Sequence, residues 1–154
     1  MIPIRDYQQF IAELTAKASE LSGVDVDRIR LAVTESQLVT LLKDQQGVVV
    51  CGNIPGMDLS YPASFWLSEG ECLLMVLERM PDDRQGTHRE FDEYARLQQL
   101  MQQIVRLLIG EDFQQFCDRG EVDFSRPLTV EWEYNQYGGF NGLSVTFRLK
   151  DKTV

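Results

Sequence analysis

Two segments near the C-terminus alternate between apolar and polar residues with a period of two. In residues 128–134 (LTVEWEY) the even positions are apolar, and in residues 143–150 (LSVTFRLK) the odd positions are apolar. This period is typical of β-strands with one buried and one solvated face. The pattern therefore predicts an amphipathic sheet that helices cover on one side, with Trp132 in the core.

The two segments are expected to form a hairpin in which Tyr134 pairs with Leu143. That pairing places all eight apolar residues on one side. The opposite, solvated side would then carry two acidic and two basic residues, which favour cross-strand pairing. These charged residues are Glu131, Glu133, Arg148 and Lys150.

Helical periodicity and capping signals predict four helices in the rest of the chain. The first spans residues 6–22 and ends at Gly23, and the second begins at a capping box, 34–37, and ends near Gly47. A second capping box, 87–90, begins the longest helix, which is expected to end near Ile109. The fourth helix is short and is predicted over residues 111–118.

Three further strands are predicted from apolar runs. The first is residues 48–51, a β-branched run, and a turn-rich loop over 52–58 follows it. The other two are residues 63–67 and 72–78, with a hairpin turn at 68–71 because Gly70 suits a positive φ.

The order of these elements predicts one α+β domain over residues 1–154. We expect a single antiparallel-rich sheet of four to five strands, with helices packed mainly on one face. The 154 residues suit a single domain. Cys51 and Cys72 lie in apolar runs, which indicates buried free thiols and a reducing compartment. No leader or membrane-spanning pattern is present in the sequence, so a cytoplasmic location is expected.

The charge of the chain argues against two classes of partner. Its formal net charge is −9, from 24 acidic and 15 basic side chains. A negative field repels phosphate backbones and anionic membrane surfaces, and no window holds a cluster of Lys and Arg. We therefore expect neither nucleic acid nor membrane as a partner.

The sequence has no recognisable catalytic or metal-binding motif. His88 is the single histidine, and it falls at an exposed position in the first turn of a helix. The acidic pairs 25–27 and 82–83 lack the further ligands of a calcium loop. Glycine-rich phosphate loops and the nucleophile elbow of hydrolases are absent. The expectation is a protein that is not an enzyme, with no cofactor and no metal.

The loop between the last two strands, residues 135–142, is the candidate site. Its three glycines favour flexibility, and its two aromatic residues have little local structure around them. Aromatic residues on such loops often anchor protein contacts. The alternative is that both rings fold back onto the sheet and the glycines only permit the turn. The candidate partner-binding residues are Tyr137, Gly138, Gly139, Phe140 and Asn141.

The order of elements resembles that of the small tail-terminator and tail-completion proteins of tailed phages. The matching pieces are the helices 6–22 and 87–109, the strands over 63–78 and the hairpin 128–150. The helix 34–46 and the strand 48–51 are additional to that outline. The resemblance implies assembly through sheet edges and loops, and it transfers no catalytic residue.

Two functions follow from the sequence. The first is a non-enzymatic assembly or adaptor protein of prophage origin, which binds protein partners, or further copies of itself, through a sheet edge and the loop 135–142. The alternative is a small-molecule-binding domain or a minor enzyme. Its pocket would lie between sheet and helices, with residues 52–58 at the mouth.

Overall fold

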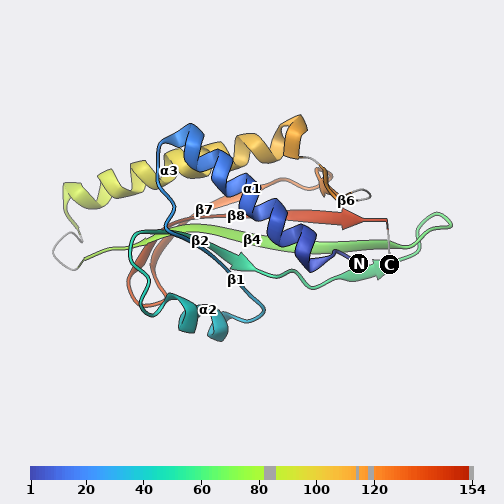
Figure 1. Ribbon diagram of the computed structural model, residues 1–154, viewed down its shortest axis with the longest axis horizontal. Helices are drawn as coiled ribbons and strands as arrows, with labels where there is room; N and C mark the ends of the chain where they lie inside the picture. Colours follow the sequence, from blue (N-terminus) through green and yellow to red (C-terminus); the bar gives the residue numbers. More distant parts are fainter. Residues whose placement is uncertain (82–85, 114, 118–119, 153–154) are drawn as a thin grey trace.

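The computed structural model describes residues 1–81, 86–113, 115–117 and 120–152. Within them, three α-helices and a 3₁₀ helix, Glu111–Phe113, pack on one mixed sheet. Two helices, α1 (Ile4–Ser22) and α3 (His88–Ile109), cover one face. The third, α2 (Glu35–Leu42), lies on the opposite face (Figure 1). The predicted α+β class is confirmed. The helices were expected mainly on one face, and α2 lies on the other.

The sheet has eight strands in the described residues, more than the four to five expected. The main path runs β1-β2-β4-β8-β6-β5, while β3 pairs with β4 and β7 pairs with β8. All pairs are antiparallel except β1–β2, which is parallel. The strands are β1 (Arg28–Ala32), β2 (Val48–Asn53), β3 (Asp58–Ser60), β4 (Leu67–Arg79), β5 (Gln115–Cys117), β6 (Gly120–Asp123), β7 (Thr129–Gln136) and β8 (Phe140–Asp151).

The first helix and the long helix match their predicted positions closely. Helix α1 begins two residues earlier than expected and ends at Gly23, whose φ of 72° is in the left-handed region. Helix α3 ends at Ile109 as predicted. In the capping box predicted at 87–90, however, the Thr87 side chain makes no capping hydrogen bond, and the Glu90 carboxylate accepts from the Gly86 N–H. These two helices pack against each other.

Helix α2 connects the parallel pair β1–β2, a unit that the sequence analysis missed because it did not predict β1. The start of the helix agrees with the predicted capping box. The Gln37 N–H donates to Thr34 Oγ1 at 3.2 Å, and Gln37 Oε1 accepts from the Val33 N–H at 2.8 Å. The helix ends at Leu42, before the predicted end near Gly47. The strand at 48–51 is confirmed and extends to Asn53.

The long strand β4 contradicts the prediction of two shorter strands. Residues 61–66 form the turn between β3 and β4, so the strand predicted at 63–67 is wrong. The hairpin predicted at 68–71 is also wrong, because the chain runs straight through it. Gly70 serves a close approach rather than a turn: a Cβ there would lie 2.8 Å from Gly56 O.

The core lies on both faces of the sheet. The larger cluster joins α1 and α3 to residues such as Val50, Leu74 and Val145. A smaller cluster lies beneath α2 and includes Leu42 and Cys51. The central strands are therefore buried on both sides.

The segment after α3 differs from its prediction. A helix was expected over 111–118, but the structure has a short 3₁₀ helix and then β5. Residues 114, 118 and 119 fall outside the described part. Strand β6 was not predicted, and it pairs with the C-terminal part of β8, Arg148–Asp151.

Candidate functional site

Strand β7 has one open edge. In the part of the chain that the structure describes, its strand partner is β8, and no strand lies on its other side. The predicted hairpin is confirmed with a different register, because Leu143 pairs with Trp132 rather than with Tyr134. A shift of two residues leaves every side chain on its expected face.

The apolar face of β7 is exposed, which contradicts the expected core position of Trp132. Val130 is 44% exposed, Trp132 58% and Tyr134 59%. The residues opposite on β8, Leu143 and Val145, are buried. The difference arises because α3 packs on β4 and β8 and leaves β7 largely uncovered.

One residue of α3, Tyr94, fixes the position of β7. Its hydroxyl donates to the carbonyl oxygen of Glu133 at 2.8 Å, and its ring meets the Trp132 ring edge-on at 5.4 Å between centroids. Partial burial raises the pKa of the Tyr94 phenol, and the nearby Glu90 adds to the rise. One helical turn earlier, Phe91 is 73% exposed. We call Val130, Trp132 and Tyr134, on the open strand, the β7 surface.

The other face of β7 carries acidic side chains, as predicted. Glu131 is exposed, and Glu133 Oε1 accepts a hydrogen bond from Ser144 Oγ at 2.7 Å. The basic residues of β8 on this face do not pair with them. Arg148 Nη1 lies 3.6 Å from Glu71 Oε2, and Lys150 Nζ lies 3.3 Å from Glu121 Oε1. Among the described residues, Glu131 therefore makes no ion pair.

The loop predicted at 135–142 is a three-residue turn, Tyr137–Gly139. Phe140 and Asn141 belong to β8 and are buried, so the predicted exposure of Phe140 is wrong. Arg79 lies over the Phe140 ring at 4.9 Å. The turn uses three consecutive positive φ angles, of which Gly138 has 86° and Gly139 has 109°. The glycines are thus needed for the turn.

Tyr137 is half-buried and folds back onto the sheet. Its hydroxyl lies 3.7 Å from Met75 Sδ, within hydrogen-bonding range, and burial raises its pKa. The alternative expectation, that the rings fold back, therefore describes both aromatic residues of this segment. Of the five candidate residues, only Gly138 is exposed, and Tyr137 and Gly139 are partly exposed, beside the end of β7.

Two hollows lie between the sheet and the helices. The smaller one, about 240 Å³, lies between the start of α2 and the sheet, and Gly52, Asn53 and Tyr137 line it. The Asn53 side chain is already used within the fold, because Oδ1 accepts from the Leu73 N–H at 2.8 Å. The larger hollow, about 600 Å³, is an open groove between α1 and β1.

Reactive side chains do not gather at either hollow. Cys51 and Cys72 are buried free thiols, as predicted, and burial raises the pKa of each to about 12. Both thiols therefore stay protonated at neutral pH. Among the described residues, no cluster of three His, Cys, Asp or Glu side chains could hold a metal ion. None of the described helices combines the length and apolar character that crossing a membrane requires.

Comparison with known proteins identifies no family for the chain. No protein-family model matches it, and no curated protein matches it either.

Proposed function

We propose that the chain is a non-enzymatic assembly or adaptor protein that binds a protein partner through the open edge of β7. The observation that carries this proposal is the exposure of Val130, Trp132 and Tyr134 on a strand whose outer edge is open. An edge with apolar side chains is prone to pair with another chain, and natural proteins usually protect such edges. A bound partner would supply that protection.

The composition of the β7 surface also suits a protein interface. Tyr and Trp are enriched among the residues that contribute most to binding, because each combines a large apolar area with a polar group. Backbone groups of an edge strand add affinity by pairing with a strand of the partner. The turn residues Tyr137, Gly138 and Gly139 continue this edge and would lie at the rim of the contact.

A more specific form of this proposal is that the protein acts in a phage particle. It comes from the resemblance in element order to tail-completion proteins, and the parallel β1–α2–β2 unit is an addition to that outline. A gene neighbourhood of tail and capsid genes would support it.

The alternative of a small-molecule-binding domain has weaker support. The hollow beneath α2, at about 240 Å³, is smaller than the usual range of ligand pockets, roughly 300–1,000 Å³. The hollow between α1 and β1, at about 600 Å³, is within that range, but it is an open groove rather than an enclosed pocket. In the smaller hollow, the Asn53 side chain is already engaged with β4 and is not available to a ligand.

In-cell photocrosslinking tests the proposed interface. A benzoylphenylalanine placed at Trp132 should yield an adduct with a partner protein. The same probe at Trp66 is a matched control, because Trp66 is also a half-exposed tryptophan but lies in the turn between β3 and β4. Absence of adducts at position 132, or equal adducts at both positions, would contradict the proposal.

A further inference from the structure

We propose that the partner of β7 is β1 of a second copy, so that the chain associates with itself head to tail. This inference rests on the proposed function, because it names the occupant of the same edge. It is supported by an open edge on β1, by complementary charges and by the groove beside β1.

The outer edge of β1 is open in the same way as that of β7. Strand β1 is at the end of the strand order, and in the described residues it pairs with β2 alone. A strand of five residues can pair along its full length with the eight residues of β7. Such an addition satisfies the outward N–H and C=O groups of both strands.

The charges on β1 complement those on β7. Ile29 and Leu31 pack against the core beneath α1 and α3. Because side chains alternate along a strand, Arg28 and Arg30 point to the opposite face. That is also the face on which β7 carries Glu131 and Glu133. If the two sheets join with the faces that α1 and α3 cover on the same side, the arginines of one copy lie beside the glutamates of the next.

One of these arginines is already partly desolvated without compensation. Arg30 is half-buried, and its Nε has no hydrogen-bond partner in the described part of the chain. A buried donor that lacks a partner costs free energy, so a carboxylate from a neighbouring strand would stabilise it. Glu131 and Glu133 are the side chains that the joined sheet would bring there.

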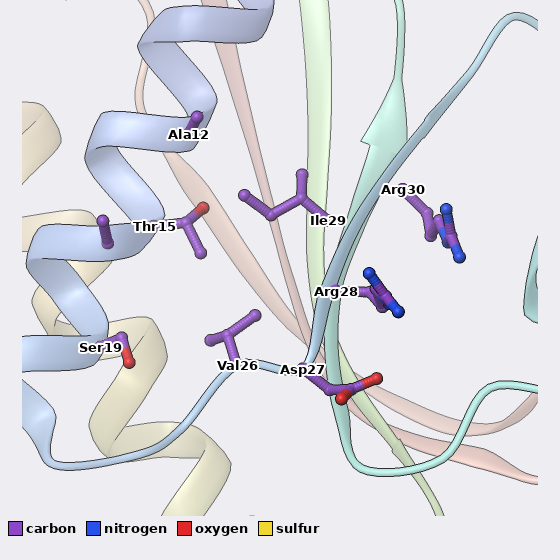
Figure 2. Close-up of a pocket in the computed structure, with 9 residues that line it drawn as sticks. Ala12, Thr15, Ser19, Val26, Asp27, Arg28, Ile29 and Arg30 are labelled. Atoms are coloured by element: carbon purple, nitrogen blue, oxygen red, sulfur yellow. The ribbon is translucent and has the colours of Figure 1, made fainter.

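We infer that the apolar face of β7 enters the groove between α1 and β1, which Asp27, Arg28 and Arg30 also line on the strand side. Its helical wall is built from small residues, and Thr15, Val26 and Ile29 turn toward one another across it (Figure 2). Thr15 is only 2% exposed, and its Oγ1 has no hydrogen-bond partner among the described residues. The helical wall consists of Ala12, Thr15, Ala16 and Ser19.

The arrangement of the two sheets that brings the arginines of β1 beside the glutamates of β7 also places Trp132 at this groove. Both the groove and the β7 surface are on the face of the sheet that α1 and α3 cover. A Trp ring supplies the apolar area that the groove would bury, and its indole N–H supplies a donor for a hydroxyl such as that of Thr15. Charge and the groove thus both favour joining the two sheets with their α1–α3 faces on the same side.

Symmetric pairing of two identical edges is disfavoured by charge. A β7–β7 contact would set Glu131 and Glu133 against the same residues, and a β1–β1 contact would set Arg28 and Arg30 against each other. Like charges across strands are destabilising. The head-to-tail contact uses two different surfaces, so repeated copies form a ring or a filament.

Charge reversal tests the pairing. We expect the wild-type mass, measured by light scattering and sedimentation velocity, to rise with concentration. Glu131 and Arg28 are exposed, so E131R and R28E should fold. Each variant alone should associate about 10-fold more weakly, and an equimolar mixture should regain association, because opposite charges again meet. E13R, at an exposed position of α1, is the control for E131R, because both variants have the same change in charge.

Filling the groove gives a second test that does not depend on charge. Ala16 lines the groove and is exposed, so A16W should fold and should abolish association. A95W, at an exposed position of α3, is the matched control and should associate like the wild type.

Several results would overturn this inference. These are a wild type that stays monomeric at all concentrations, E131R and R28E variants that associate like the wild type, or a mixture that does not recover. If the wild type is monomeric while position 132 crosslinks to a different protein, the inference fails and the proposed function stands. If position 132 gives no adduct at all, the proposed function fails as well.

Discussion

Gly142 is required because β4 and β8 approach too closely there for any side chain. A Cβ at this position would lie 1.8 Å from the carbonyl oxygen of Val76. G142A should therefore force the two central strands apart and lower the free energy of unfolding by about 3 kcal/mol, the upper end for overpacking. Urea denaturation measures the loss.

The control for this change is G56A. Gly56 has open space around its Cβ position, so the variant should differ from the wild type by less than about 0.5 kcal/mol. Equal urea midpoints for G142A and G56A would show that the ladder between β4 and β8 can yield.

At this scale, sequence predicts burial well for some residues and poorly for others. Cys51 ends an apolar run on β2 and Cys72 begins one on β4, and both are buried as predicted. Trp132 has the same alternating context as Val145, yet it is exposed. Alternation specifies the face of a strand, whereas coverage depends on how far α3 reaches across the sheet. Phe140 is the opposite case, because its place beneath Arg79 comes from a residue 61 positions away.

Helix α2 is held on its face of the sheet by Arg79, at the end of β4. The Arg79 guanidinium donates through Nη2 to the carbonyl oxygens of Leu42 at 3.0 Å and Lys43 at 2.9 Å. These are the last carbonyls of the helix, where a positive charge is favourable. R79M retains an apolar stem and removes both bonds, so it should lower stability by about 2 kcal/mol.

Hydrogen exchange distinguishes this local role from a general loss of stability. In R79M the amides of α2 should exchange faster than in the wild type, by a larger factor than those of α1. R126M, at an exposed arginine, should change neither. Unchanged exchange in α2 of R79M would mean that packing of Leu38 and Leu42 alone holds the helix.

The elements that the sequence predicted are those with local signals. Capping residues identified the start of α2, and Gly23 identified the end of α1, because caps satisfy backbone groups within a few residues. Gly70 misled the prediction, since Gly56, 14 residues away, approaches it in space. Strand β1 was missed because a run of five residues, RIRLA, becomes a strand through its pairing with β2.

At the scale of the whole molecule, the two cores share the same central strands. Adjacent residues of β2, such as Val50 and Cys51, point into opposite cores. The same holds for Leu74 and Met75 of β4. Loss of one core therefore removes packing from the backbone that supports the other, and we expect the molecule to unfold as one unit.

Truncations in the two cores test this coupling. Leu14 of α1 and Leu42 of α2 are both fully buried, one in each core. L14A and L42A should each lower the free energy of unfolding by about 2–5 kcal/mol. In both variants the far-UV circular dichroism and tryptophan fluorescence curves should remain coincident, because a single transition reports the whole sheet. L21A, at a half-exposed position of α1, is the control and should change the midpoint little. If L42A instead gives an early separate transition, α2 and its core form an independent unit, and the β1 edge would open before the rest of the sheet.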